Sequence, residues 1–223
     1  MCGRFSLTRP LDDLAAFFEL YELFQKPNLQ PRWNIAPTQK TAVVRAQAGR
    51  RDIALLRWGF AGPNNAPLIN ARAETASSKQ TFAEAFARRR CLIPADSFYE
   101  WQAVEGQKQK QPWRIGLKGG GLFAFAGLWQ PEPAFGNADC FTILTTAAND
   151  YLAPLHERMP VILPREQFGL WLDPATPRPI LQRLLQSYPA AEMARYRVTP
   201  VVNGVKTDGP ECFAPLNAAL KVA

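Results

Sequence analysis

Apolar residues near the start of the chain recur with a helical period. In the stretch LTRPLDDLAAFFELYELF, Thr8 can cap a helix and Pro10 suits its first turn. The apolar residues at helical spacing are Leu11, Leu14, Ala15 and Phe18. Such a stripe is typical of a helix that covers a core, so we predict an early helix with this face buried.

Three further stretches show the same period. SSKQTFAEAFARRR places Phe82 and Phe86 on one face and gathers Arg88, Arg89 and Arg90 at its C-terminal end, where the helix dipole favours cations. We interpret these arginines as a solvated helix end rather than a nucleic-acid cradle. A third and a fourth helix are predicted at REQFGLWL and RPILQRLLQSY.

Short apolar runs rich in aromatic and β-branched residues lie between the helices and are typical of strands. They are TAVVRA, IALLRWGF, SFYEWQ, PWRIGL, LFAFAGLW, CFTILTT, MPVIL and RYRVTPVV. Polar and glycine-rich connections, VEGQKQKQP and KGGG, separate some of them. So many strands predict an α+β fold with a largely antiparallel, barrel-like β core and peripheral helices. A length of 223 residues fits one domain, which we expect to span residues 1–223.

The charge of the chain narrows the class of partner. Lys and Arg total 26 against 19 Asp and Glu, a formal charge of +7, which favours a polyanion such as nucleic acid. No run approaches the roughly 20 apolar residues of a membrane helix, and the start of the chain lacks a secretory signal pattern. We therefore expect a cytosolic or nuclear protein with no membrane partner.

The cysteines are widely scattered. They are Cys2, Cys91, Cys140 and Cys212, and the chain has one histidine. Zinc sites need closely spaced Cys or His ligands, so we expect no metal and no cofactor. In a reducing compartment the four thiols should be free.

Cys2 becomes the first residue once Met1 is removed, and it then carries a thiol and a primary amine on adjacent carbons. The α-amino pKa of about 7.7 to 8.0 leaves part of this amine neutral and nucleophilic at physiological pH. An aldehyde reacts with such a pair through an imine to a thiazolidine ring. The alternative is that a small residue after Met1 only permits methionine removal, since most free cysteines are inert.

The segment INARAET is a second candidate for the functional site, as a group that binds substrate. Asn70 and Arg72 alternate onto one side of an extended chain, and an amide beside a guanidinium suits a sugar phosphate. The alternative is a strand end that leads into a helix, with Glu74 or Thr75 near the N-cap.

Two more residues can carry acid–base chemistry. Glu100 lies between two aromatic residues in SFYEWQ, where burial would raise its pKa toward the useful range. An exposed position on the solvent face of the strand is the equal alternative. His156, in LHERMP, is the only imidazole, so a mechanism that needs one must use it. Its structural alternative is a surface segment in which Glu157 and Arg158 form a weak ion pair.

Six fragments in order, MCGRF, WNIAPTQ, RWGF, INARAET, CLIPADSFYEWQ and LHERMPVIL, resemble the SRAP family, the SOS response-associated peptidases. The resemblance runs from Cys2 to at least NGVKTDGPEC. It implies a single mixed α/β domain around a barrel-like set of strands, which binds single-stranded DNA and crosslinks covalently to abasic sites. The electrophile would then be the ring-opened sugar aldehyde.

The resemblance also implies residue roles. Cys2 matches the crosslinking residue, Asn70 the active-site asparagine, Glu100 the acid–base glutamate and His156 the histidine. Positions similar to those that contact DNA are held by Arg4, Arg72, Arg158 and Trp58.

Further expectations follow from the resemblance. We expect a monomer that removes Met1 in a peptidase-like step, with lyase-like reversal of the crosslink as a further activity. We place it in the cytoplasm, associated with the nucleoid on damage, if the source is bacterial, and in the nucleus if it is eukaryotic.

One segment departs from the family pattern, and two other functions stay open. AGPNNAP stands where family members can carry tryptophans, and Asn64 and Asn65 cannot stack on a base as an indole does. A glutamine amidotransferase also begins Met-Cys-Gly and uses its terminal cysteine as nucleophile, although such chains typically continue with small apolar residues where Arg4 and Phe5 stand. The other alternative is a non-catalytic basic DNA-binding module.

Overall fold

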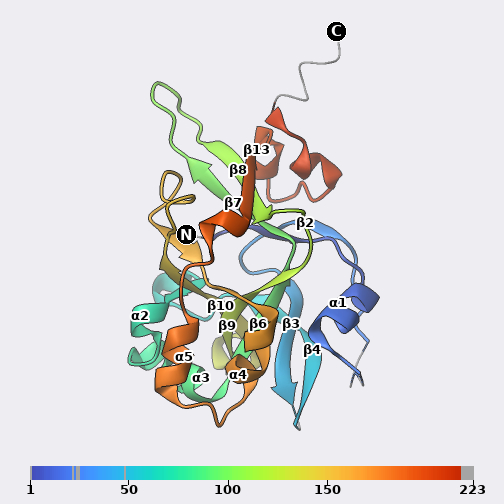
Figure 1. Cartoon of the computed structure of the whole chain (residues 1–223), viewed down its shortest axis with the longest axis vertical. Coiled ribbons are helices and arrows are strands. Elements are labelled where there is room, and N and C mark those ends of the chain that lie inside the picture. The colour runs from blue at the N-terminus through green and yellow to red at the C-terminus, as the bar shows by residue number, and fades with distance from the viewer. Residues whose placement is uncertain (1, 22, 24–25, 48, 217–223) are drawn as a thin grey trace.

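The computed structural model describes residues 2–21, 23, 26–47 and 49–216 (Figure 1). The strands are β1 (Phe5–Leu7), β2 (Arg32–Ile35), β3 (Lys40–Gln47), β4 (Arg50–Trp58), β5 (Asn70–Arg72), β6 (Arg90–Ala95), β7 (Ser97–Gln102), β8 (Gln111–Leu117), β9 (Phe123–Glu132), β10 (Ala138–Ala147), β11 (Arg158–Pro160), β12 (Ile162–Leu163) and β13 (Met193–Arg197). The α-helices are α1 (Leu11–Phe18), α2 (Ala73–Ala76), α3 (Gln80–Arg88), α4 (Phe168–Leu172) and α5 (Arg178–Leu184).

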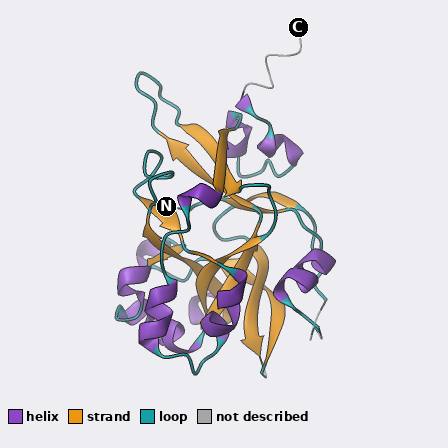
Figure 2. Ribbon diagram, in the orientation of Figure 1, coloured by secondary structure: helices purple, strands orange, loops and turns teal. Residues whose placement is uncertain are grey.

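A closed barrel of five strands lies at the centre of the fold. β10 pairs in parallel with β4, and antiparallel pairs continue through β3, β6 and β9 back to β10. β5 and β11 extend the sheet along β10, and β12 extends it along β9. Figure 2 shows α2 to α5 grouped on one side of the barrel and α1 on the other. The predicted α+β fold with a barrel-like, largely antiparallel core and peripheral helices is confirmed.

A second sheet, in the order β13–β8–β7–β1–β2, is antiparallel throughout and lies above the barrel in Figure 1. Its strand β1 anchors the start of the chain, because Phe5 pairs with Phe98 of β7. The Phe5 ring also meets the rings of Trp58 and Phe125, with centroid distances of 5.1 and 5.8 Å. Edge contacts of this kind add specific geometry to the burial of aromatic area. Cys2 is therefore held three residues away from a rigid anchor.

Helix α1 buries the predicted apolar face but begins differently from the prediction. Pro10 is its N-cap, and Thr8 makes no capping bond. The Thr8 amide and hydroxyl instead both donate to one oxygen of the buried Asp96 carboxylate, each at 2.6 Å. A buried carboxylate requires such donors, and this requirement outweighs the local capping preference. The helix ends where Glu19 takes a left-handed φ of 57°, and residues 22 and 24 of the predicted stretch lie outside the described residues.

Helix α3 buries Phe82 and Phe86 as predicted, but the three arginines at its C-terminal end do not form one solvated group. Arg88 is exposed, whereas Arg90 belongs to β6 and is only 4% exposed. Its guanidinium donates four hydrogen bonds of 2.6–2.8 Å to backbone carbonyls at the ends of α3 and α4. The prediction for Arg90 was wrong because helix C-termini leave carbonyls without partners, and a buried cation here satisfies those of two helices at once. The accepting carbonyls belong to Phe86, Ala87, Trp171 and Asp173.

We expect Arg90→Met to lower the free energy of unfolding by about 2–4 kcal/mol, because it leaves buried carbonyls without donors. Urea denaturation measures the change, and the exposed Arg88→Met is the matched control, which should unfold like the wild type. Equal stability of the two variants would show that the Arg90 bonds contribute nothing to the fold.

Several short strands lack a readable pattern in the sequence. β1, β2 and β5 span three or four residues each, too few to show a period. The run MPVIL forms two strands, β11 and β12, that pair with different neighbours. The run RYRVTPVV is a strand only as far as Arg197, because Pro200 cannot donate to a ladder and begins a 3₁₀ turn. Among the described helices, none is both long and apolar enough to cross a membrane.

Candidate functional site

The site forms where the start of the chain meets the barrel. Asn70 begins β5, which lies beside β10 with Asn70 opposite Ile143. The Asn70 side-chain amide donates to the Cys2 carbonyl at 2.9 Å. Its Oδ1 is buried and has no hydrogen-bond partner among the described residues. Asn70 therefore holds the backbone of Cys2 and keeps an acceptor available at the same place.

The Cys2 side chain is fully buried, and its Sγ lies 3.8 Å from the carbonyl oxygen of Arg4. Burial raises the pKa of the Cys2 thiol well above its usual range, and the negative charge of Glu100 raises it further. The thiol is thus protonated at neutral pH.

Glu100 lies on β7 and is 6% exposed. Its neighbour Tyr99 faces the other side of the strand, where its hydroxyl donates to the Trp33 carbonyl at 2.8 Å. Burial raises the pKa of the Glu100 carboxyl above its ordinary range. Of the two alternatives left by the sequence, the structure rules out the exposed glutamate and supports a carboxyl that holds its proton to higher pH.

His156 lies in the loop between β10 and β11. Its Nδ1 accepts the backbone N–H of Arg158 at 2.9 Å, which leaves the proton of the neutral ring on Nε2. Burial lowers the pKa of the imidazole. The positive charge of Lys110 makes a smaller contribution and lowers the pKa of both His156 and Glu100.

Arg158 joins β11 to α2 through Glu74. Its two terminal nitrogens donate to the two Glu74 carboxylate oxygens at 2.6 and 2.9 Å, and it also bonds the Thr145 carbonyl. Hydrogen bonding from Arg158 holds the pKa of Glu74 below its ordinary value. Glu74 stands in the first turn of α2, two residues after the N-cap Arg72, so the alternative of a strand end that leads into a helix with Glu74 near the N-cap is confirmed. A phosphate at Arg158 must share the guanidinium with this carboxylate.

The other two arginines with a predicted DNA role differ in exposure and in hydrogen bonding. Arg72 is exposed at the end of β5, after the buried Ala71. Arg4 donates to the Asn34 Oδ1 at 2.8 Å and to the Val202 carbonyl at 3.0 Å. Arg4 also lines an open pocket together with Trp101, Asn203 and Gly3, the residue that follows Cys2.

Trp58 does not fit the role predicted for it. Its side chain is fully buried, its ring stacks on Phe141 with centroids 6.1 Å apart, and its Nε1 donates to the Ile69 carbonyl at 2.9 Å. A side chain with no exposed surface cannot contact DNA in this conformation. Trp58 instead supports the residue before Asn70, which is a positioning role.

Asn34 and Asp208 are positioning residues that the sequence reasoning missed. The fully buried Asn34 amide donates to the carbonyls of Val202, Gly204 and Thr207, at 3.1, 3.0 and 2.7 Å. Asp208 accepts the Asn34 backbone N–H at 2.9 Å. These bonds hold the NGVKTDG segment against β2, and the Val202 carbonyl just before it accepts from both Asn34 and Arg4. The fragments WNIAPTQ and NGVKTDGPEC, which contain Asn34 and Asp208, were the available signal, because the family resemblance includes both.

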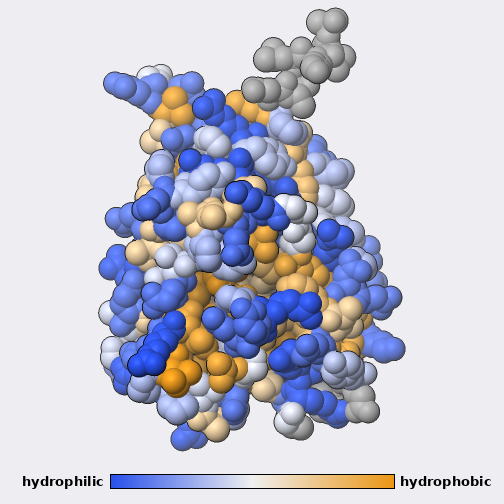
Figure 3. All heavy atoms as spheres, in the orientation of Figure 1, coloured by the Kyte–Doolittle hydropathy of each residue, from blue (hydrophilic) through white to orange (hydrophobic). Residues whose placement is uncertain are grey.

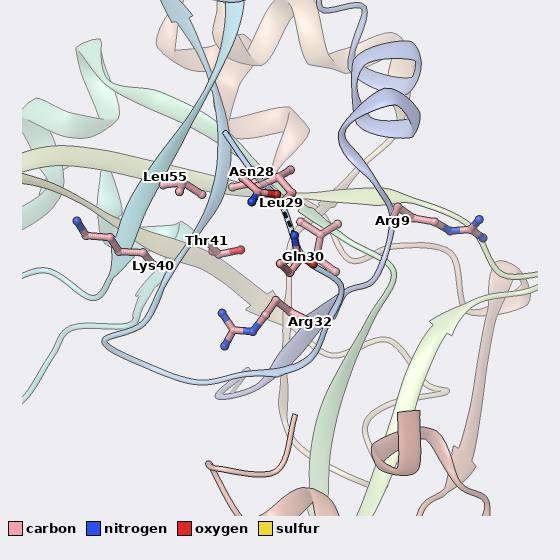
Figure 4. A pocket seen from close by; sticks show the side chains of 10 residues that line it. Arg9, Asn28, Leu29, Gln30, Arg32, Lys40, Thr41 and Leu55 are labelled. Atoms are coloured by element: carbon pink, nitrogen blue, oxygen red, sulfur yellow. Dashed lines mark hydrogen bonds between the residues drawn. The ribbon is translucent and has the colours of Figure 1, made fainter. Parts of the chain in front are cut away.

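A separate pocket lies beside β3 (Figure 4). Side chains that line it include Arg9, Asn28, Gln30, Arg32, Lys40 and Leu55. None of the four predicted catalytic residues lines this pocket. Within the described part of the chain, no group of three or more His, Cys, Asp and Glu side chains could hold a metal ion.

Known proteins resemble this chain over almost its whole length. The family model of the SOS response associated peptidases (SRAP) matches residues 1–205. The abasic site processing protein YoaM of Bacillus subtilis is 39% identical over 221 residues, which cover 95% of this chain and 96% of that protein. The abasic site processing protein YedK of Escherichia coli is 30% identical over 224 residues, which cover 97% and 100%. A solved structure of a protein from Bacteroides thetaiotaomicron matches 96% of this chain and 100% of its own with a TM-score of 0.80 at 21% identity, which shows a shared fold. From the family model and these relatives, we conclude that this chain is a member of the SRAP family.

Proposed function

We propose that this chain binds single-stranded DNA and forms a covalent crosslink to an abasic site through Cys2, as a thiazolidine that shields the lesion. The names of the relatives YoaM and YedK support an abasic site as substrate. The observation that carries the proposal is the constellation at the start of the chain. The Asn70 amide holds the Cys2 carbonyl at 2.9 Å, and a buried Glu100 lies close enough to raise the pKa of the Cys2 thiol.

The amine of a processed Cys2 is the better first nucleophile. Burial raises the pKa of the thiol, so little thiolate exists at neutral pH, whereas an α-amine with a pKa near 8 is partly neutral. A glutamine amidotransferase needs the thiolate to attack an amide. The environment of Cys2 therefore favours the aldehyde chemistry over the amidotransferase alternative.

The reaction then balances with the loss of one water. The amine adds to the C1′ aldehyde of the ring-opened sugar, and the resulting hydroxyl leaves as water when an acid protonates it, which gives an imine. The Cys2 thiol adds to the imine carbon, its proton passes to the nitrogen, and the five-membered ring closes. The protonated Glu100 carboxyl supplies the acid, and neutral His156 offers an Nε2 proton as a hydrogen-bond donor to the sugar.

The DNA is recognised by what it lacks. A missing base leaves room for the start of the protein, so no base edge needs to be read and little sequence specificity is expected. Arg4, two residues after Cys2, and Arg72, two residues after Asn70, offer cations to the DNA phosphates, and Arg158 adds a third that is already paired with Glu74. The loop of residues 61–67, which lacks tryptophan, offers no indole for a neighbouring base.

Processing precedes the crosslink in this proposal. Met1 lies outside the described residues, and its removal is required because an acylated nitrogen cannot form an imine. The same acid–base groups could run the ring closure in reverse, which would make release of the DNA a lyase-like step.

Intact mass spectrometry under denaturing conditions tests the proposal. We expect purified protein without Met1, mixed with a single-stranded oligonucleotide that holds one abasic site, to give a mass equal to the sum of both minus one water. The same oligonucleotide with its abasic aldehyde reduced to an alcohol is the matched control and should give no adduct. No adduct from a properly processed Cys2 would contradict the proposal, and glutamine hydrolysis by the same sample would identify the amidotransferase.

A further inference from the structure

An aromatic and basic surface continues from Glu100 across the second sheet. Glu100 of β7 lies opposite Trp113 of β8, and Trp113 lies opposite Arg197 of β13. Directly opposed residues of antiparallel strands present their side chains on the same face. Glu100, Trp113 and Arg197 therefore form one row across three strands, and Arg195, two residues before Arg197, lies on the same face.

Two arginines frame the Trp113 indole. The guanidinium carbon of Arg195 lies 5.1 Å from the centroid of the Trp113 ring, and that of Arg197 lies 5.4 Å from it. Both distances are within the range of a cation–π contact. The indole Nε1 donates to the Gln102 Oε1 at 3.0 Å, which fixes the orientation of the ring.

Arg195 also connects this face to the loop that carries His156. The Arg195 guanidinium lies 4.5 Å from the centroid of the Tyr151 ring and donates to the Tyr151 carbonyl. The Arg195 backbone N–H also donates to the Tyr151 hydroxyl at 3.1 Å. We name Trp113, Tyr151, Arg195 and Arg197 the Trp113 platform. It lies opposite Glu100 and reaches, at Tyr151, the loop that carries His156.

The platform is accessible and positively charged. Trp113 and Arg195 are half-buried, and Arg197 is exposed. The β7–β8 hairpin projects beyond the barrel in Figure 1, and its turn carries the exposed Lys108 and Lys110. Hydrophilic residues cover most of the face seen in Figure 3, including the projecting end of this hairpin. Aromatic rings interleaved with cations are the surface that binds an unpaired nucleic-acid strand.

We propose that the Trp113 platform binds one arm of the single-stranded DNA next to the abasic nucleotide, with a base stacked at Trp113 and phosphates against Arg195 and Arg197. This inference rests on the proposed function of Cys2. Two strand spacings, roughly 10 Å in total, separate Glu100 from Arg197, which corresponds to about three stacked nucleotides at roughly 3.4 Å each. The platform therefore contacts only one of the two arms.

Fluorescence anisotropy with a tetrahydrofuran analogue of the abasic site tests the platform separately from the crosslink, because this analogue has no aldehyde and cannot form an imine. Two oligonucleotides carry an arm of about six nucleotides only on the 5′ side or only on the 3′ side of the analogue. We expect Trp113→Ala to weaken binding about tenfold for one of them and less than about twofold for the other. Trp113→Phe keeps an aromatic ring and should restore most of the affinity, which separates stacking from damage to the fold.

The salt dependence supplies a second readout. Arg197→Gln should lower the slope of log K against log salt by about 0.7 for the oligonucleotide whose arm Trp113 binds. Arg183→Gln removes an exposed arginine from α5 and is the matched control, which should bind and crosslink like the wild type. Equal effects of Trp113→Ala on both arms, or an unchanged slope in Arg197→Gln, would overturn the inference. If the wild type binds through the platform but never crosslinks, the proposed function of Cys2 fails and the platform stands.

Discussion

We expect Cys2→Ala to form no DNA adduct that survives denaturation, although it keeps a primary amine at the start of the chain. Alanine permits removal of Met1, so the variant can still form an imine with an abasic aldehyde, but it has no thiol to close the ring. An imine alone is hydrolysed when the protein is denatured. Denaturing gel electrophoresis and intact mass spectrometry measure the loss, and Cys140→Ala, which removes another buried thiol, is the matched control.

Borohydride separates the amine from the thiol in this experiment. Reduction converts an imine to a stable amine, so Cys2→Ala treated with borohydride should again give an adduct. A variant with lysine inserted between Met1 and Cys2 blocks the α-amine of Cys2 and should give no thiazolidine adduct at Cys2. Peptide mapping after proteolysis distinguishes it from an adduct at the lysine. A stable adduct from Cys2→Ala without reductant would show that another residue forms the bond.

We expect Glu100→Gln to slow crosslinking by about 10²- to 10⁴-fold, because it removes the acid that expels water from the carbinolamine. Burial raises the pKa of Glu100, so the wild-type rate requires a protonated carboxyl and a neutral Cys2 amine at the same time, and its pH profile is bell-shaped. The variant should retain only the rise in rate that accompanies loss of the proton from the amine. Single-turnover kinetics across pH measure both effects. Binding of the tetrahydrofuran oligonucleotide should stay close to that of the wild type, and an unchanged rate would remove Glu100 from the mechanism.

The same substitution has a signed effect on stability. Because the pKa of Glu100 is raised in the folded protein, that state binds more protons than the unfolded state between the ordinary pKa of about 4.3 and the raised value. The free energy of unfolding of the wild type therefore falls as the pH rises through this window. Glu100→Gln lacks this fall. Urea denaturation should therefore show that the free energy of unfolding of the variant increases relative to that of the wild type as the pH rises. Such a result would also establish that the slow variant is folded.

The candidate site and its supports differ in how far the sequence alone could predict them. Two kinds of information identified the four catalytic candidates: the chemistry that each residue type offers and the order of the motifs. Neither kind requires knowledge of the fold. The candidates are Cys2, Asn70, Glu100 and His156. The supporting residues depend on partners far along the chain. Asn34 binds the carbonyl of Val202 across 168 residues, and no local period records that contact.

The sequence by itself determined the α+β class, the longer strands and the helix faces, because each depends on a period of two or 3.6 residues that is written in local apolar spacing. Only the tertiary structure decided the environment of the polar residues and of Trp58. A strand pattern cannot tell which face another element will cover, so it left Glu100 open between solvent and core. The family resemblance likewise gave Trp58 a DNA contact without showing that the side chain is buried. Closure of the barrel buried Trp58, packing of the second sheet buried Glu100, and the unpaired carbonyls of two helix ends drew Arg90 inside. Burial depends on how all the strands and helices pack together, and it is burial that raises the pKa of Glu100.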